Sequence, residues 1–75
     1  MNDGRPAKHS LTLNGHRTSV SLEAEFWAEF RAIADVQGIA INQLAARIDA
    51  GRAANSGLAS AIRVFVLKYP KRPET

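Results

Sequence analysis

The sequence predicts a mainly α-helical fold with an N-terminal β element, and three observations support this class. Residues 9–22 are rich in Ser, Thr, Val and Leu and alternate in polarity, as a half-buried strand does. The segments 23–37 and 41–50 carry apolar residues at helical spacing, and each is followed by a glycine. The segment 57–69 is apolar on nearly every side, which is typical of a covered helix.

The length of the chain allows one domain. We expect a flexible arm over residues 1–8, a domain over 9–69 and a basic tail over 70–75 of the 75 residues. Monomers of this size are only marginally stable, and without cysteine neither a disulfide nor a Cys/His zinc site can reinforce the fold. We therefore expect a homodimer that uses no metal and no cofactor.

Hydropathy and charge indicate where the protein acts and what it contacts. No apolar run approaches the roughly 20 residues that span a bilayer, and the first ten residues lack the apolar segment of a secretory signal. The chain therefore fits the cytoplasm, with no membrane contact. The net charge is +3, with basic ends around an acidic middle over residues 22–52. This distribution permits nucleic-acid binding through a restricted face.

The pair Asn14-Gly15 interrupts the β segment. Both residues tolerate the positive φ of a type I′ turn, so the pair is a strong hairpin signal. In one unbroken strand, Leu11 and Leu13 would share a face with Arg17. A two-residue turn gathers the apolar residues on one face through three pairs: Leu13 with His16, Leu11 with Thr18, and His9 with Val20. A bulge at Gly15 would also shift the phase by one residue, so both alternatives remain.

The helical segments have recognisable stripes and ends. The stripe of the first helix consists of Leu22, Phe26, Phe30, Ile33 and Ala34, with Trp27 beside it. Ile41, Leu44 and Ile48 share one side of the second helix. Asn55 or Ser56 is expected to cap the third helix, and Pro70 ends it. Because this helix has little polar surface, we expect a partner subunit to cover it.

Three stretches carry a resemblance to a known family: GHRTSVSLE followed by FW, the turn QGIAINQL, and LASAIRVFVL. They resemble the ribbon-helix-helix superfamily of bacterial and phage DNA-binding repressors, and more closely a small bacterial branch regarded as DNA-binding regulators. The resemblance covers about residues 9–69. It implies a homodimer in which the strands of two chains pair into an antiparallel ribbon that enters the DNA major groove.

The resemblance also implies which residues contact bases. Alternate strand side chains of the superfamily face the base edges, which corresponds here to Arg17, Ser19 and Ser21. Arg17 can bond guanine bidentately, whereas the serines suit either a base or a phosphate.

The remaining implied contacts concern phosphates and the dimer core. The backbone N–H groups near Ala40, Ile41 and Asn42 would bind a phosphate at the positive end of the second helix. Arg5 and Lys8 would add salt-dependent phosphate contacts. The implied dimer core comprises Val20, Leu22, Phe26, Phe30, Ile41, Leu44 and Ile48.

Two departures from the superfamily pattern bear on DNA binding. Relatives often place Ser or Thr before the second helix, where this chain has Ala40. A hairpin at Asn14-Gly15 would also add an outer strand to each side of the ribbon. The major groove admits two strands, so a four-stranded sheet fits only if its outer strands curl away or its centre contacts the bases.

Aromatic and histidine side chains have simpler interpretations than ligand binding. Phe26 and Trp27 could stack on bases, but their place at a helix start favours packing. His9 and His16 share a face of the hairpin without being opposite each other, and no other ligand type accompanies them. We expect surface or DNA-facing histidines here and no metal site.

Catalysis is not expected. Glu23, Glu25 and Glu29 are interpreted as charges near the start of a helix, because no pocket accompanies them. Ser and His residues occur, but their spacing assigns no orienting triad. An alternative to DNA binding is a dimeric protein-interaction module, either an antitoxin-like partner or an adaptor. The acidic first helix, the apolar third helix and the outer strand favour that alternative.

Overall fold

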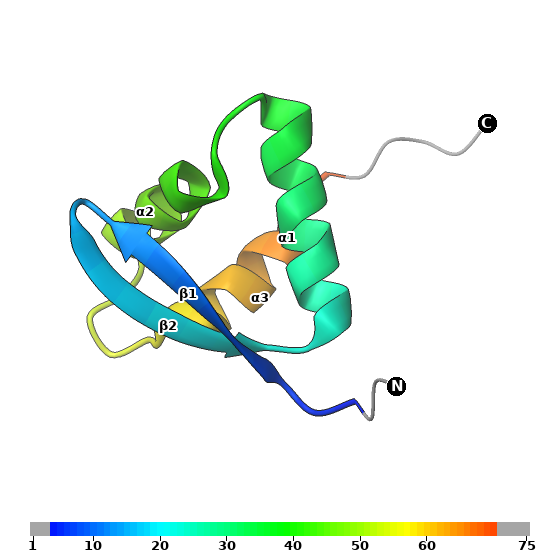
Figure 1. The fold of residues 1–75 in the computed structure, drawn as a ribbon, viewed down its shortest axis with the longest axis horizontal. Helices are drawn as coiled ribbons and strands as arrows, with labels where there is room; N and C mark the ends of the chain where they lie inside the picture. The colour runs from blue at the N-terminus through cyan, green and yellow to red at the C-terminus, as the bar shows by residue number, and fades with distance from the viewer. Residues whose placement is uncertain (1–3, 71–75) are drawn as a thin grey trace.

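A single antiparallel hairpin followed by three helices makes up the fold (Figure 1). The computed structural model describes residues 4–70, so most of the expected basic tail lies outside the described residues. The elements are β1 (Ala7–Leu13), β2 (His16–Leu22), α1 (Ala24–Gln37), α2 (Ile41–Gly51) and α3 (Leu58–Lys68). The predicted class, mainly α with an N-terminal β element and a third helix, is confirmed.

The hairpin turns at the predicted pair. Asn14 has a φ of 52° and Gly15 a φ of 85°, the two positive values of a type I′ turn. All three predicted pairs are present, so the chain forms a hairpin and not a bulged strand. β1 begins at Ala7, two residues before the expected strand, because Ala7 pairs with Leu22 and the ladder extends to the end of β2.

Replacing Gly15 by alanine should lower the free energy of unfolding by about 1–2 kcal/mol. The loss comes from the left-handed backbone alone, because an added Cβ meets no atom within 4 Å. Gly51→Ala is the matched control: its Cβ also meets nothing within 4 Å, but Gly51 lies in helix α2. That variant should be neutral or more stable by up to about 1 kcal/mol. Urea unfolding measures both, and equal effects would contradict the assigned turn.

The end of α1 follows the glycine pattern, whereas α2 runs one residue further than predicted, because Gly51 lies inside the helix and Arg52 is its C-cap. After α1, Gly38 adopts a φ of 69°, and the N–H of Ile39 bonds the Ala34 carbonyl at 3.1 Å, as in a Schellman motif. The prediction that Asn55 or Ser56 caps α3 is wrong, because Gly57 is the N-cap and no side chain bonds there. Instead, the Ser56 N–H closes the preceding turn on the Ala53 carbonyl at 3.0 Å.

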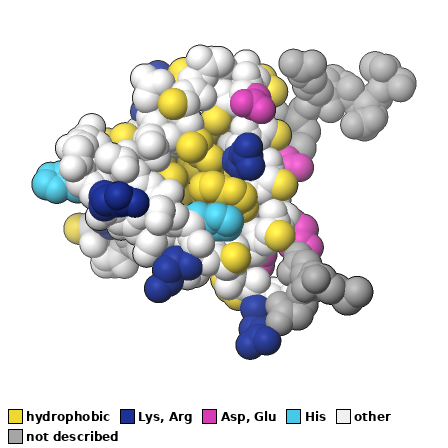
Figure 2. All heavy atoms as spheres, viewed as in Figure 1, with side chains coloured by type: hydrophobic (Ala, Val, Ile, Leu, Met, Phe, Trp, Pro, Cys, Tyr) yellow, Lys and Arg dark blue, Asp and Glu magenta, His cyan; other side chains and the backbone are white. Residues whose placement is uncertain are grey.

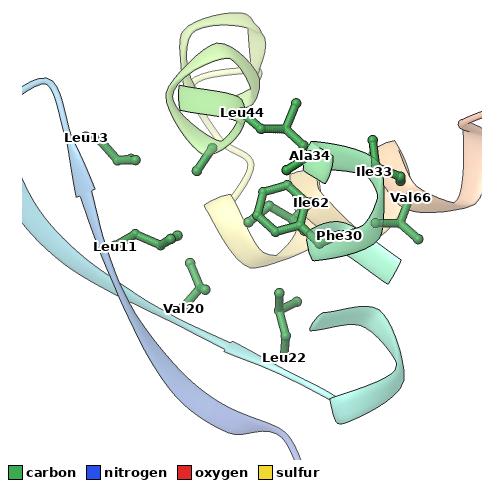
Figure 3. Packing of buried hydrophobic residues seen from close by; sticks show 11 residues of the cluster. Leu11, Leu13, Val20, Leu22, Phe30, Ile33, Ala34, Leu44, Ile62 and Val66 are labelled. Atoms are coloured by element: carbon green, nitrogen blue, oxygen red, sulfur yellow. The ribbon is translucent and has the colours of Figure 1, made fainter. Parts of the chain in front are cut away.

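The hydrophobic core lies between the inner face of the hairpin and the three helices (Figure 3). Every element contributes buried apolar side chains: Leu11, Leu13, Val20 and Leu22 from the sheet, Phe30, Ile33 and Ala34 from α1, Leu44 and Ala45 from α2, and Ile62 and Val66 from α3. No polar or charged residue within residues 4–70 is buried as a whole. One chain therefore encloses a continuous core.

Helix α3 is covered on one side by its own chain. Ile62 and Val66 are buried, whereas Val64 and Leu67 are 46% and 77% exposed. The buried apolar side chains of α3 thus pack in the core of their own chain. The other apolar side chains of this helix stay exposed on the surface. None of the helices formed by the described residues is long and apolar enough to cross a membrane.

Candidate nucleic-acid interface

The outer face of the hairpin is entirely polar. Alternation along the two strands places six exposed side chains on it: Lys8, Ser10 and Thr12 from β1, and Arg17, Ser19 and Ser21 from β2. The pairs across this face are Lys8 with Ser21, Ser10 with Ser19, and Thr12 with Arg17. The three residues predicted to contact bases therefore lie together on one exposed surface, and β1 adds three more.

The opposite face explains why this surface is presented outward. Leu22 is fully buried, and Leu11, Val20 and Leu13 are no more than 8% exposed. A one-residue slip of either strand would replace its apolar side chains on the inner face by hydroxyls and cations. The core therefore fixes which side chains face outward.

The outer face of the hairpin is free of acidic side chains. The outer face holds Lys8 and Arg17 and no carboxylate. On the side shown in Figure 2, Asp and Glu side chains lie mostly over α1, where one cationic side chain accompanies them, and further Lys and Arg side chains lie along the hairpin. The Asp49 carboxylate near the turn is paired with Arg52 at 2.7 Å. The hairpin therefore presents cations and hydroxyls, which are the groups that bind phosphates and base edges.

The start of α2 lies beside the hairpin. The Asn42 side-chain oxygen accepts a hydrogen bond from the Thr12 N–H at 3.1 Å, which ties this helix end to β1. The Ala40 N–H donates to the Gln43 side chain at 3.2 Å, and no side chain caps the helix from Ala40. Of the predicted phosphate-binding N–H groups, that of Ala40 therefore already has a partner, and those of Ile41 and Asn42 open the helix next to the ribbon.

Arg63 of α3 fixes the other end of the hairpin. Its Nε bonds the Glu23 carboxylate at 2.9 Å, and its Nη2 bonds the Ser21 carbonyl at 3.2 Å. The guanidinium also lies 5.9 Å from the centre of the Phe26 ring. The hydrogen bond from Arg63, aided by a backbone hydrogen bond, holds the pKa of the Glu23 carboxyl below its ordinary value. This cluster joins β2, α1 and α3.

The Glu23–Arg63 pair should make stability dependent on pH. Because the folded-state pKa is lowered, ionised Glu23 stabilises the fold at neutral pH, and this contribution is lost as the pH falls through the folded-state pKa. In urea unfolding, Glu23→Gln should therefore be less stable than wild type at pH 7, and the difference should close toward pH 3. Glu25→Gln, on the exposed first turn of α1, should follow the wild-type curve. A Glu23→Gln difference that stays constant with pH would contradict this prediction.

The residues predicted for a dimer core lie in two environments. Val20, Leu22, Phe30 and Leu44 are buried in the core of their own chain. Phe26, Ile41 and Ile48 are half-buried against that core. The structure thus brings all seven together within one chain, and the second group retains surface that another molecule can contact.

The aromatic side chains pack against the fold. Trp27 stacks on His9 with ring centres 3.9 Å apart, and it lies 6.0 Å from Phe30. His9 is on the inner side of the hairpin and its Nε2 is buried without a hydrogen-bond partner, so the expectation of a surface or DNA-facing residue is wrong for His9. His16 is exposed beside the turn. Within residues 4–70, no three side chains of the ligand types gather as a metal would require.

Two residues contribute side-chain contacts to the site that the sequence patterns above did not predict. Asn42 was predicted for its backbone, whereas its side chain binds β1. Arg63 sits in an apolar segment and contacts residues more than 39 positions earlier in the chain. The lone charge within LASAIRVFVL was the available signal, because a charge on a covered helix needs a partner.

A polar two-stranded ribbon backed by packed helices defines the class of small ribbon-and-helix domains. A family model described as a ribbon-helix-helix domain matches residues 6–70, and the chain belongs to this family. The domain is typical of DNA-binding regulators and antitoxins, which generally form dimers and are not as a rule enzymes. No curated protein and no solved structure gave a significant match.

Proposed function

We propose that this protein is a sequence-specific, DNA-binding transcription regulator of the bacterial cytoplasm that acts as a homodimer, typically as a repressor. The exposed outer face of the hairpin carries the proposal, because it combines cations with hydroxyls and lacks acidic groups. The family supports it, since ribbon-helix-helix domains are typical of DNA-binding regulators. Arg17, Ser19 and Ser21 contact base edges in the major groove.

Phosphate contacts position the ribbon on the duplex. The N–H groups of Ile41 and Asn42 lie at the positive end of α2, which Asn42 holds against β1. A phosphate flanking the groove accepts hydrogen bonds from these groups. Arg5 and Lys8, toward the N-terminal end of the hairpin, add contacts to the phosphate backbone.

Selection of bound sequences from a random duplex library, performed at two salt concentrations, tests this function. A specific regulator enriches one motif at both salt concentrations, and its affinity falls as the salt rises. Binding without an enriched motif would indicate electrostatic attraction alone. Absence of binding at both concentrations would exclude the proposal.

A second candidate function is a dimeric protein-interaction module, antitoxin-like or adaptor-like, with weak or no DNA binding. The observation that favours it is the apolar surface near α3, where a 540 Å³ hollow is lined by Leu44, Ile48, Val64 and Phe65 among others. Purification from the native host distinguishes the candidates. A stoichiometric second protein together with an empty library selection would favour this function, and an enriched motif bound by the protein alone would count against it.

A further inference from the structure

We propose that a hollow at the turn end of the hairpin binds a phosphate group. The hollow has a volume of about 400 Å³ and lies between the turn, the end of α2 and the start of α3. The phosphate belongs either to the DNA backbone or to a free phosphorylated small molecule. In the first case the inference rests on the proposed DNA-binding function, and in the second it stands without it. The polar lining of the hollow comprises Asn14, His16, Arg17, Thr18, Asp49 and Arg52.

Most polar groups in this lining can donate hydrogen bonds. Arg17 and Arg52 are permanent cations whose planar guanidinium groups match the oxygens of a phosphate. His16 has an N–H donor in either protonation state, and Asn14 and Thr18 add an amide and a hydroxyl. Donors from two segments that are distant in the sequence therefore meet at one hollow.

Arg52 is positioned before any ligand binds. Its Nε donates to the Asp49 carboxylate at 2.7 Å, and its Nη1 donates to the Ser56 carbonyl. The Nη2 group takes part in neither contact, and the side chain is 31% exposed. A phosphate can therefore bind Nη2 without ordering a mobile side chain, which lowers the entropic cost of binding.

Asp49 is the acidic group of the lining and reduces its positive charge. Two arginines and one carboxylate give the lining a net charge of +1 when His16 is neutral. The Asp49 carboxylate repels an anion in the hollow, but it also orients Arg52. These two effects have opposite signs, so a substitution of Asp49 separates a phosphate-binding role of Arg52 from a purely structural one.

The hollow adjoins the surface that contacts DNA in the proposed function. Arg17 lies on the outer face of the hairpin and also lines the hollow. In an antiparallel two-chain ribbon the strands run in opposite directions, so each end of the ribbon has one hollow. Phosphates of both DNA strands lie beside the groove that the ribbon enters. The site is separate from the predicted phosphate contact at the start of α2, because Asp49 and Arg52 lie at the other end of this helix.

Titration of the full chain with inorganic phosphate, followed by two-dimensional NMR, tests the site without DNA. Phosphate should shift the Arg52 Nε–H signal and the His16 and Thr18 amide signals along one saturating curve, with a Kd on the order of 1–10 mM. Sodium chloride at matched ionic strength should produce no such curve. The Arg47 Nε–H signal is the internal control, because Arg47 lies on α2 and lines a different hollow.

Arg52→Gln is the first variant in this titration, and it should remove the saturating shifts of the His16 and Thr18 amides. Arg47→Gln, on the same helix, should keep them. The amide spectrum of each variant also shows whether the variant is folded. Saturating shifts that persist in folded Arg52→Gln would overturn the inference.

Asp49→Asn is a second variant, whose use does not depend on the folding of Arg52→Gln. It keeps an oxygen that accepts the Arg52 hydrogen bond but removes the negative charge, so it should tighten phosphate binding about 2- to 5-fold. Asp35→Asn changes the net charge equally, on α1 and outside the hollow, and should have little effect. Unchanged or weaker phosphate binding by Asp49→Asn would mean that the Asp49–Arg52 pair is only structural.

Duplex binding identifies the source of the phosphate. If the source is DNA, Arg52→Gln should weaken binding of the selected duplex and of a scrambled duplex alike, about 2- to 10-fold, because a phosphate contact carries no sequence information. The slope of log K against log salt concentration should also fall in magnitude by about 1. If duplex affinity is unchanged while inorganic phosphate still saturates the site, the ligand is a free phosphorylated small molecule.

The outcomes separate the phosphate site from the proposed function. A wild-type protein without saturating shifts in inorganic phosphate would overturn the phosphate site, and a motif enriched in the library selection would still support DNA binding. Saturating shifts together with an empty library selection would overturn the DNA-binding function and assign the hollow to a free phosphorylated small molecule.

Discussion

Replacing Arg17 by alanine should weaken binding to the selected duplex about 5- to 150-fold and relax the preference at one base pair. This range corresponds to the loss of one bidentate contact of about 1–3 kcal/mol with a guanine. Arg17 is exposed on the outer face of the hairpin opposite Thr12, so its removal leaves the core intact. Titration of the selected duplex and of a scrambled duplex measures affinity and preference together.

Two further variants identify which property of Arg17 matters. Arg17→Lys keeps the positive charge but loses the two parallel N–H donors of the guanidinium. Compared with Arg17→Ala, it should therefore restore affinity for the scrambled duplex more fully than it restores the base preference. Arg31→Ala removes an exposed arginine from α1, away from the hairpin, and should change affinity little. If Arg17→Ala and Arg31→Ala lowered DNA affinity equally, binding would depend only on the net charge of the protein.

Replacing Phe30 by alanine should lower the free energy of unfolding by about 3–5 kcal/mol. The Phe30 side chain is fully buried at the centre of the core, between the hairpin and α3 (Figure 3). A domain of this size has about 4–11 kcal/mol of stability in total, so the variant should be largely or partly unfolded at 37 °C. Urea unfolding followed by far-UV circular dichroism measures the loss.

Val36→Ala is the matched control for this prediction. Val36 lies on the same helix and is 60% exposed, so its truncation should change the free energy of unfolding by no more than about 0.5 kcal/mol. A small loss from Phe30→Ala would contradict the assignment of a core enclosed by one chain.

The local structure was predictable wherever it depends on neighbouring residues. Asn14-Gly15 predicted that the strand is interrupted, and the phase of the apolar residues gave the register of the hairpin alternative; the two positive φ values then decided for the hairpin over a bulge. Gly38 predicted the end of α1 for the same reason. The cap of α3 was mispredicted because Asn55, Ser56 and Gly57 are all acceptable N-caps, and only the turn that precedes the helix selects among them.

The candidate site was predictable only in part. Alternation placed Arg17, Ser19 and Ser21 on one face, because side chains of a strand point to opposite sides in turn. It did not show that β1 would place Lys8, Ser10 and Thr12 on the same face, since that depends on the pairing of the two strands. The predicted arm ended at Lys8, whereas the ladder carries that residue onto the outer face.

The sequence by itself determined the order of the elements, the end of α1, the interruption of the strand at Asn14-Gly15 and which strand residues are apolar. These features depend on backbone preference and on periodicity within a few residues. Only the tertiary structure decided that Asn42 and Arg63 each bond one backbone group at an edge of the hairpin, from positions 30 and 42 residues away. Long-range hydrogen bonds of this kind arise from packing the core, because burying the inner leucines brings α2 and α3 to the edges of the sheet.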